Sequence, residues 1–200
     1  MPSFLEPAFL IETLGLIGVI AIVFAESGLF FGFFLPGDSL LFTAGLLASQ
    51  GHLDIFWLVI GCMVAAIVGD SVGYAFGKKV GPKLFSREDS FFFHKKHAER
   101  ARDFYQKHGK KAIILARFVP IIRTFAPIVA GIGQMEYRTF ISYNIIGGIA
   151  WTVSMTLSGY FLGHTIPGIE DYLHFIILAI IIVSFIPILL EFRKNRKKVV

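Results

Sequence analysis

The stretch "RFVPIIRTFAPIVAGIG", residues 117–133, decides how the rest of the chain is interpreted. It is apolar enough to enter a membrane, yet it contains Arg117, Pro120, Arg123 and Pro127. A helix that crosses a bilayer avoids buried charge, and proline removes a backbone hydrogen-bond donor. The segment therefore does not fit an ordinary crossing helix, and the charges elsewhere in the chain indicate what it does instead.

The composition is that of an integral membrane protein. The 200 residues have a mean hydropathy of +0.70, and only 16% of them are charged, whereas soluble domains are about a quarter charged. We predict a single membrane domain that covers residues 1–200. The one cysteine, Cys62, excludes an internal disulfide, and metal-ligand spacing is absent, so we expect neither a metal nor another cofactor.

The basic residues are segregated along the chain. No Lys or Arg precedes Lys78, whereas eleven lie in residues 78–111, three in 112–138 and five in 193–198. Basic loops beside apolar spans are typically cytoplasmic, so we expect the block 78–111 and the C-terminus inside the cell. This placement disfavours a nucleic-acid partner, because such blocks serve first as topology determinants that contact anionic lipid.

Hydropathy separates ordinary spans from two unusual segments. A spanning helix requires roughly 20 apolar residues, and the predicted ordinary spans are residues 8–25, 56–77, 140–163 and 174–191. The unusual segments are 28–50 and 112–133, which prolines interrupt. Three apolar segments lie between the two basic blocks, so one of them does not cross. We predict that 112–133 is a hairpin that enters from the cytoplasm and returns, buried in protein or beside a wet cavity.

An internal repeat with an offset of 86 residues relates the two unusual segments. "GYAFG" at 73–77 falls on "GYFLG" at 159–163, and eight of the 34 positions in 44–77 are identical after this shift. The repeat predicts two inverted halves, about 26–83 and 112–168, each a re-entrant hairpin followed by a spanning helix. Inverted repeats whose broken elements meet near the bilayer midplane are a transporter design. The residues expected to shape the hairpins are Pro36, Gly37, Pro120 and Pro127.

The same symmetry sets the remaining topology. The hairpin 28–50 is expected to enter from outside, and the N-terminus is expected to lie inside. Residues 84–111 are predicted as a cytoplasmic segment with an amphipathic helix at about 90–108 along the inner interface. The predicted fold class is an all-α integral membrane protein with an inverted repeat and additional N- and C-terminal transmembrane helices.

Four charged residues should meet at membrane depth. If both hairpins reach the midplane, Glu26 and Asp38 of the first approach Arg117 and Arg123 of the second. One interpretation is a set of structural ion pairs, since pairing reduces the cost of charge in a bilayer. In the other, the carboxyls carry protons and the planar arginine forks bind phosphate.

Three further polar residues lie within the apolar spans. Asp70 is a third candidate proton-coupling acid, placed nearer the inner end of its span, where a helix-dipole or capping role fits as well. Asn144 is interpreted as an interhelical hydrogen-bonding residue and Trp151 as a packing residue. Neither of these two predicts function by itself.

Three motifs resemble the DedA family, which is related to the SNARE-associated Golgi protein or VTT-domain superfamily. They are "ESGLFFGFFLPGDSLLFTAGLLA", "GDSVGYAFGKKVG" and "RFVPIIRTFAPIVAGIGQMEYRTF", within residues 20–165. The resemblance implies two opposed re-entrant hairpins, a bacterial inner-membrane location and proton-dependent transport of lipids such as undecaprenyl phosphate or phosphatidylethanolamine. The residues that match the functional acids and arginines of the family are Glu26, Asp38, Arg117 and Arg123.

The expected function is translocation of a phosphate-bearing lipid, coupled to protons or to the membrane potential. The partners are therefore membrane lipids, with a polyprenyl-phosphate or phospholipid headgroup, and protons. A proton-coupled exporter of small cations or drugs remains an alternative, as does a membrane assembly factor that transports nothing. An enzyme such as a lipid phosphatase is not expected, because no histidine lies near the arginines in the sequence.

Overall fold

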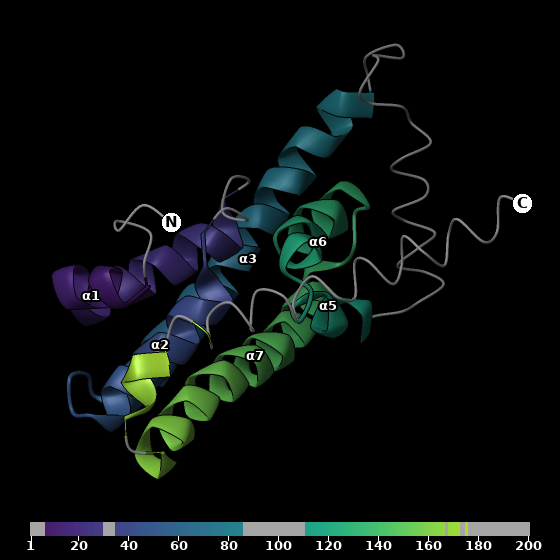
Figure 1. Cartoon of the computed structure of the whole chain (residues 1–200). Helices are drawn as coiled ribbons and strands as arrows, with labels where there is room; N and C mark the ends of the chain where they lie inside the picture. The colour runs from purple at the N-terminus through teal and green to yellow at the C-terminus, as the bar shows by residue number, and fades with distance from the viewer. Residues whose placement is uncertain (1–6, 30–34, 86–110, 167, 173–174, 176–200) are drawn as a thin grey trace, which may run out of the picture.

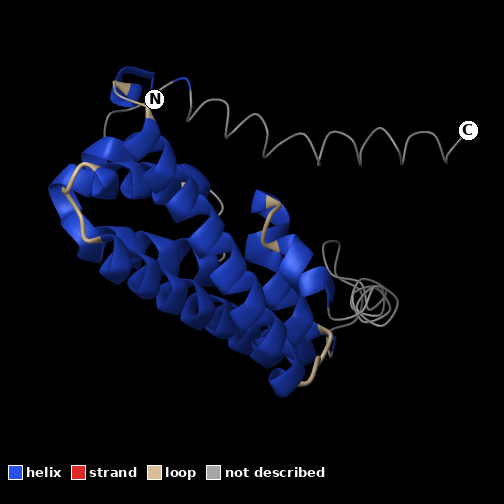
Figure 2. Cartoon of the chain, turned by 90° about the horizontal axis from the view of Figure 1, so that it is seen from below, coloured by secondary structure: helices blue, strands red, loops and turns tan. Residues whose placement is uncertain are grey.

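A computed structural model describes residues 7–29, 35–85, 111–166, 168–172 and 175. Within these ranges the chain is helical and has no strand (Figures 1 and 2), which confirms the all-α class for the described part. The elements are α1 (Pro7–Gly28), α2 (Gly37–Ser49), α3 (Ile55–Phe85), α5 (Lys111–Ala116), α6 (Pro120–Ile132), α7 (Tyr137–Thr165) and the short 3-10 helix η3 (Ile169–Tyr172). The predicted helices at 90–108 and 174–191 lie outside the described residues.

The two long helices α3 and α7 form the frame of the molecule. Among the described residues, Ile55–Val80 and Tyr137–Thr165 are long and apolar enough to cross a membrane, as predicted for 56–77 and 140–163. The start of α3 is capped by Asp54, whose Oδ1 accepts the backbone N–H groups of Phe56 and Trp57 at 2.9 and 3.0 Å.

The contacts between α3 and α7 show that these helices run antiparallel. Asn144 Nδ2 donates to the carbonyl of Ile67 at 3.0 Å. Tyr74 lies seven residues after Ile67 in α3, and it stacks on Phe140, which lies four residues before Asn144 in α7. The two ring centroids are 4.6 Å apart. Later residues of α3 therefore contact earlier residues of α7.

The first helix differs from the predicted span 8–25. Gly15 has φ 61° and ψ −160°, a conformation that glycine adopts more readily than other residues. This conformation interrupts α1. The helix as a whole runs over 22 residues, Pro7–Gly28, in two pieces that meet at this kink. The segment predicted as an ordinary span at 8–25 is therefore helical, but it is kinked at Gly15.

The second part of α1 instead forms an antiparallel pair with α2. Gly61 lies beside Ile20, and Gly69 beside Gly28, so α1 runs in the same direction as α3. Only residues 50–54 connect α2 to α3, so α2 runs the opposite way. The first arm of the predicted hairpin at 28–50 is consequently the end of α1.

The segment predicted as a hairpin at 112–133 forms the second helix pair, α5 and α6. The helix breaks at residues 117–119, where Val119 is extended with φ −120° and ψ 107° and Pro120 follows as the first residue of α6. Proline favours this position because the first N–H groups of a helix have no helical partner. The helix α6 continues through Pro127, so the bend predicted there is wrong, while the break beside Pro120 is confirmed.

Glycines allow close packing of each short helix on a long one. Gly159 of α7 lies against the carbonyl of Phe42 in α2, and Gly77 of α3 lies against the carbonyl of Ile128 in α6; a side chain at either glycine would overlap that backbone. Figure 1 shows α2 along α7 and α6 beside α3. Phe42 and Ile128 are 86 positions apart, whereas Gly77 and Gly159 are 82 apart. The same helix crossing thus occurs twice, with a four-residue difference.

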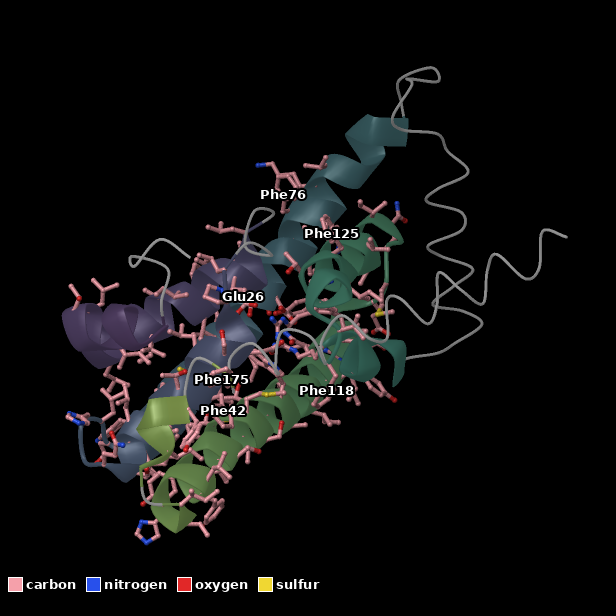
Figure 3. The ribbon with its side chains drawn as sticks, viewed as in Figure 1. Glu26, Phe42, Phe76, Phe118, Phe125 and Phe175 are labelled. Atoms are coloured by element: carbon pink, nitrogen blue, oxygen red, sulfur yellow. The ribbon has the colours of Figure 1, made fainter. Side chains whose placement is uncertain are left out.

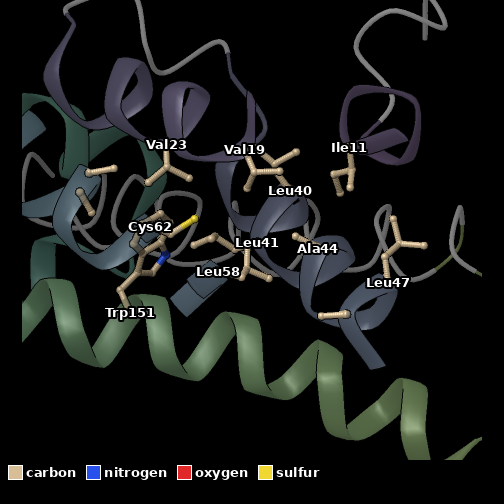
Figure 4. Close-up of a cluster of buried hydrophobic side chains, with 13 residues drawn as sticks. Ile11, Val19, Val23, Leu40, Leu41, Ala44, Leu47, Leu58, Cys62 and Trp151 are labelled. Atoms are coloured by element: carbon tan, nitrogen blue, oxygen red, sulfur yellow. The ribbon is translucent and has the colours of Figure 1, made fainter. Parts of the chain in front are cut away.

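The main apolar core lies between α1, α2, α3 and α7 (Figure 4). Val19 and Val23 of α1 pack with Leu40 and Leu41 of α2, which are fully buried. Trp151 extends from α7 toward Cys62 at one edge of this core (Figure 4). The indole therefore has an apolar core on one side, and its other neighbours are charged.

Candidate functional site

Five ionisable side chains gather where the helix breaks meet, and we call them the charge cluster. Figure 3 shows Glu26 near the centre of the helices, where side-chain nitrogen and oxygen atoms are concentrated. Four members are no more than 3% exposed and Asp38 is 13% exposed, so the cluster is withdrawn from its surroundings. Its members are Glu26 of α1, Asp38 of α2, Asp70 of α3, Arg117 at the α5–α6 break and Arg123 of α6.

Arg123 lies between two carboxylates. Its Nη1 donates to Asp38 Oδ1 at 2.6 Å, and its Nη2 donates to Glu26 Oε1. Pro120 starts α6, which places Arg123 in its first turn, and Arg123 N accordingly donates to the carbonyl of Val119 at 2.8 Å. The predicted approach of Arg123 to both acids is therefore confirmed.

Gly37 permits the approach of Glu26. A Cβ atom at position 37 would overlap the Glu26 carboxylate, so only glycine leaves room for the carboxylate at the start of α2. Pro36 precedes this helix, and its carbonyl accepts a hydrogen bond from Ser39 Oγ at 2.9 Å. The Pro-Gly pair therefore has two local effects: it begins α2 and opens space for an acid from α1.

Arg117 has a different set of partners. Its Nη2 donates to Asp70 Oδ2 at 2.5 Å and to Asn144 Oδ1 at 2.5 Å, and it lies 3.2 Å from the Ala66 carbonyl. Its Nε and Nη1 are buried and have no acceptor among the residues that the structure describes. Arg117 therefore retains donors that its described neighbours do not use.

Asp70 differs from its sequence interpretation. It lies in the middle of the 31-residue helix α3, and it pairs with Arg117 across 47 positions of sequence. A helix-dipole or capping role requires a terminal turn, so that interpretation is wrong. Glu26 and Asp38 pair with Arg123 and not with Arg117, so the two arginines have separate acids.

Trp151 has polar contacts that sequence reasoning missed. Its Nε1 donates to Asp38 Oδ1 at 2.7 Å, and its ring lies 4.4 Å from Arg123 Cζ and 6.0 Å from Arg117 Cζ. In sequence it is one aromatic residue in an apolar span, a context typical of packing. Asn144 was interpreted as an interhelical hydrogen-bonding residue, and its bonds to Arg117 and to Ile67 confirm that.

The charge cluster combines groups that can bind an anion with groups that can take up a proton. Arginine forks bind phosphate oxygens, and buried carboxyls take up protons when an anion replaces them as partners. Among the described residues, no group of three His, Cys, Asp or Glu side chains could hold a metal ion.

The sequence has close relatives of known name. A family model described as the VTT domain matches residues 35–161. Protein DedA of Escherichia coli (strain K12) is 49% identical over 178 residues, which cover 88% of this chain and 81% of that protein. The chain belongs to the DedA family.

Other DedA-family relatives carry membrane names. An uncharacterized membrane protein of Mycobacterium leprae is 43% identical, over 95% of this chain and 87% of its own length. The inner membrane protein YqjA of Escherichia coli (strain K12) is 33% identical, over 72% of this chain and 66% of its own length. No solved structure matches the chain. These names support a bacterial inner-membrane location for this DedA-family protein.

Proposed function

We propose that this DedA-family protein translocates a phosphate-bearing lipid across the cytoplasmic membrane, coupled to protons or to the membrane potential. Undecaprenyl phosphate is the first candidate and a phospholipid the second. The observation that carries the proposal is the guanidinium of Arg117, which is buried with Nε and Nη1 unpaired. A buried charged donor without an acceptor costs more than about 1–3 kcal/mol, and an anionic headgroup would remove that cost.

In this proposal, the three acids of the charge cluster couple anion binding to proton uptake. The cluster contains three carboxyls and two arginines, so a phosphate that binds there brings negative charge to a site that already has excess acid. Binding then requires that Glu26, Asp38 or Asp70 takes up a proton. When the headgroup leaves, the proton is released and the carboxylates pair with the arginines again, so that uptake of one proton with a singly charged headgroup leaves the net charge of the site unchanged.

We infer that both helix pairs are re-entrant and belong to inverted halves. The support is the repeated glycine crossing of α2 with α7 and of α6 with α3, together with the antiparallel course of α3 and α7. Only α3 and α7 then cross among the described helices, and the headgroup passes the cluster between them while the tail stays in lipid. The start of α1 then lies on the same side as the loop at residues 50–54, which differs from the prediction of a cytoplasmic N-terminus.

Cysteine labelling tests this topology. In a Cys62→Ala background, Thr13→Cys and His52→Cys should react with an impermeant reagent from the same face of the membrane, and Lys78→Cys from the opposite face. Labelling of positions 13 and 52 from opposite faces would show that α1 crosses, and the re-entrant arrangement of α1 and α2 would be rejected.

Leaflet-resolved translocation tests the function. Proteoliposomes with undecaprenyl phosphate are compared with proteoliposomes containing undecaprenol, each with and without a pH gradient. We expect only the phosphorylated lipid to change leaflet. Arg117→Lys should slow it by roughly 10- to 100-fold, as expected for loss of one or two charge-assisted hydrogen bonds. Arg138→Lys, at an exposed position on α7, is the matched control and should be unchanged.

The alternatives give other results in the same assay. A cation or drug exporter, which the excess of acids over arginines favours, would release protons when a substrate cation is added and would move no lipid. An assembly factor would do neither. Equal movement of both lipids would also contradict the phosphate site.

A further inference from the structure

We propose that Trp151 is the positioning residue that links the acid and the arginine of the Arg123 site. This inference rests on the proposed function and adds a residue to it. The indole contacts Asp38 through its N–H and Arg123 through its ring face. One rigid side chain thus fixes both partners of the ion pair in which an acid and an anion would compete.

The hydrogen bond to Asp38 defines the position of that carboxylate. Oδ1 of Asp38 accepts from both Trp151 Nε1, at 2.7 Å, and Arg123 Nη1, at 2.6 Å. An indole N–H is a donor only, so it favours a carboxylate with a lone pair directed toward it. When an anion replaces Asp38 as the partner of Arg123, Trp151 still holds Asp38 in place. The carboxyl then remains positioned to pair with the arginine again.

The ring face defines the position of the guanidinium. Arg123 Cζ lies 4.4 Å from the ring centroid, whereas Arg117 Cζ lies at 6.0 Å, near the limit for a cation–π contact. The indole is fully buried, so this attraction is not weakened by water. It persists whether Asp38 or a phosphate is the partner of Arg123, because the ring contacts the face of the guanidinium and leaves its edges available.

The charged surroundings of Asp38 come from several helices. Arg123 of α6 and Trp151 of α7 contact it directly, and Glu26 of α1 shares Arg123 with it. Arg117 at the α5–α6 break and Asp70 of α3 form the neighbouring pair. A change of protonation anywhere in this set alters the field at the indole, which makes Trp151 an internal reporter.

Fluorescence of a single-tryptophan protein tests the link. The chain has two tryptophans, and Trp57 is an exposed residue at the start of α3, so Trp57→Phe leaves Trp151 as the only emitter. In detergent we expect the emission to change with pH and with farnesyl phosphate, but not with farnesol. Asp38→Asn in this background should reduce the pH response, because it removes the carboxylate that the indole N–H contacts. An emission that is independent of both pH and Asp38→Asn would overturn the link.

Two substitutions separate the two contacts. Trp151→Phe keeps an aromatic face and removes the N–H, so it should shift the pH profile of transport while farnesyl phosphate binding changes by less than about threefold. Trp151→Leu removes both contacts and should weaken that binding by about 5- to 30-fold, the range for a buried cation–π contact. Phe140→Leu is the matched control, a fully buried aromatic of α7 that stacks on Tyr74; it should lower stability and leave pH profile and binding unchanged.

The outcomes distinguish this inference from the proposed function. A pH response of the emission without any response to farnesyl phosphate would preserve the Trp151–Asp38 link and contradict the anion site. Equal pH profiles and equal lipid binding in folded wild type, Trp151→Phe and Trp151→Leu would show that Trp151 only packs the core, and the inference would be rejected.

Discussion

The two arginines of the charge cluster differ in how completely their donors are used. Arg123 directs both terminal nitrogens at carboxylates and leaves only Nε without an acceptor among the described residues, and an indole ring covers it. Arg117 concentrates its contacts on Nη2, with one carboxylate, one amide and one backbone carbonyl, and leaves Nε and Nη1 without acceptors. Under the proposed function, Arg123 belongs to an ion pair that must open during transport, whereas Arg117 has donors available for an anion.

Removal of either arginine is expected to have the largest effects on transport and on stability. Arg123→Ala leaves Glu26 and Asp38 buried side by side without a cation, and we expect loss of transport and a stability loss of about 3–5 kcal/mol. Arg117→Ala leaves only Asp70 unpaired and should destabilise less while abolishing transport equally. Thermal unfolding in detergent, with translocation in proteoliposomes, measures both effects.

A charge swap serves as the counter-test. Asp38→Arg combined with Arg123→Asp preserves the pair but moves the guanidinium to α2. We expect it to recover part of the stability and no transport. Full recovery of transport by the swap would show that pairing alone matters and that the arginine position does not.

Substitution of Gly37 should disturb the Arg123 site alone. A Cβ there would overlap the Glu26 carboxylate, so Gly37→Ala should displace Glu26 and cost about 1–3 kcal/mol, the range for overpacking. Gly147→Ala is the matched change at the Arg117 site, where a Cβ would lie 3.3 Å from Ile114 Cα and 3.4 Å from Arg117 Cδ, a tight contact without overlap, and it should cost less than Gly37→Ala. Equal unfolding temperatures for the two variants would contradict this difference.

Asn144→Asp should make the Arg117 site resemble the Arg123 site, in which the arginine lies between two carboxylates. It gives Arg117 a second carboxylate beside Asp70 in place of the amide that accepts from Nη2. The additional negative charge should weaken farnesyl phosphate binding, more at alkaline than at acidic pH, because the new carboxyl repels an anion only when ionised. Binding measured across pH tests this, with Asn144→Leu as the uncharged control; identical pH profiles for the two variants would count against it.

The smallest expected effects lie at the ends of the helices that supply Asp38 and Arg123. After α2 the reversal occurs at Gly51, with φ 86°, and after α6 at Gln134, with φ 53°. Met135 N then donates to Ala130 O at 3.0 Å, and His52 N to Leu47 O at 3.1 Å, as in a Schellman motif. Gln134→Gly should stabilise by about 1 kcal/mol and Gly51→Ala should destabilise by about 1–2 kcal/mol. Shifts of the same sign in the unfolding temperature would refute this assignment.

Particular residues show how far local sequence could predict this site. Glu26, Asp38 and Arg123 were placed together because each charge lies in an interrupted apolar segment, and interruption is visible in sequence. The partner of Arg117 was missed, because Asp70 lies in an uninterrupted helix that carries no sign of the other pair. The break at Gly15 was missed as well, since a single glycine in an apolar pattern is usually tolerated within a helix.

By itself, the sequence determined the membrane class, the helices α3 and α7, the break beside Pro120 and the residues that carry buried charge. These features are local, since hydropathy and proline act within one or two turns. Only the tertiary structure decided which acid faces which arginine and that Trp151 contacts both partners of one pair. These choices depend on how α6 packs on α3 and how α2 packs on α7. The register of each packing is set by a close backbone contact, of Gly77 with Ile128 and of Gly159 with Phe42, and the two residues of each contact are far apart in sequence.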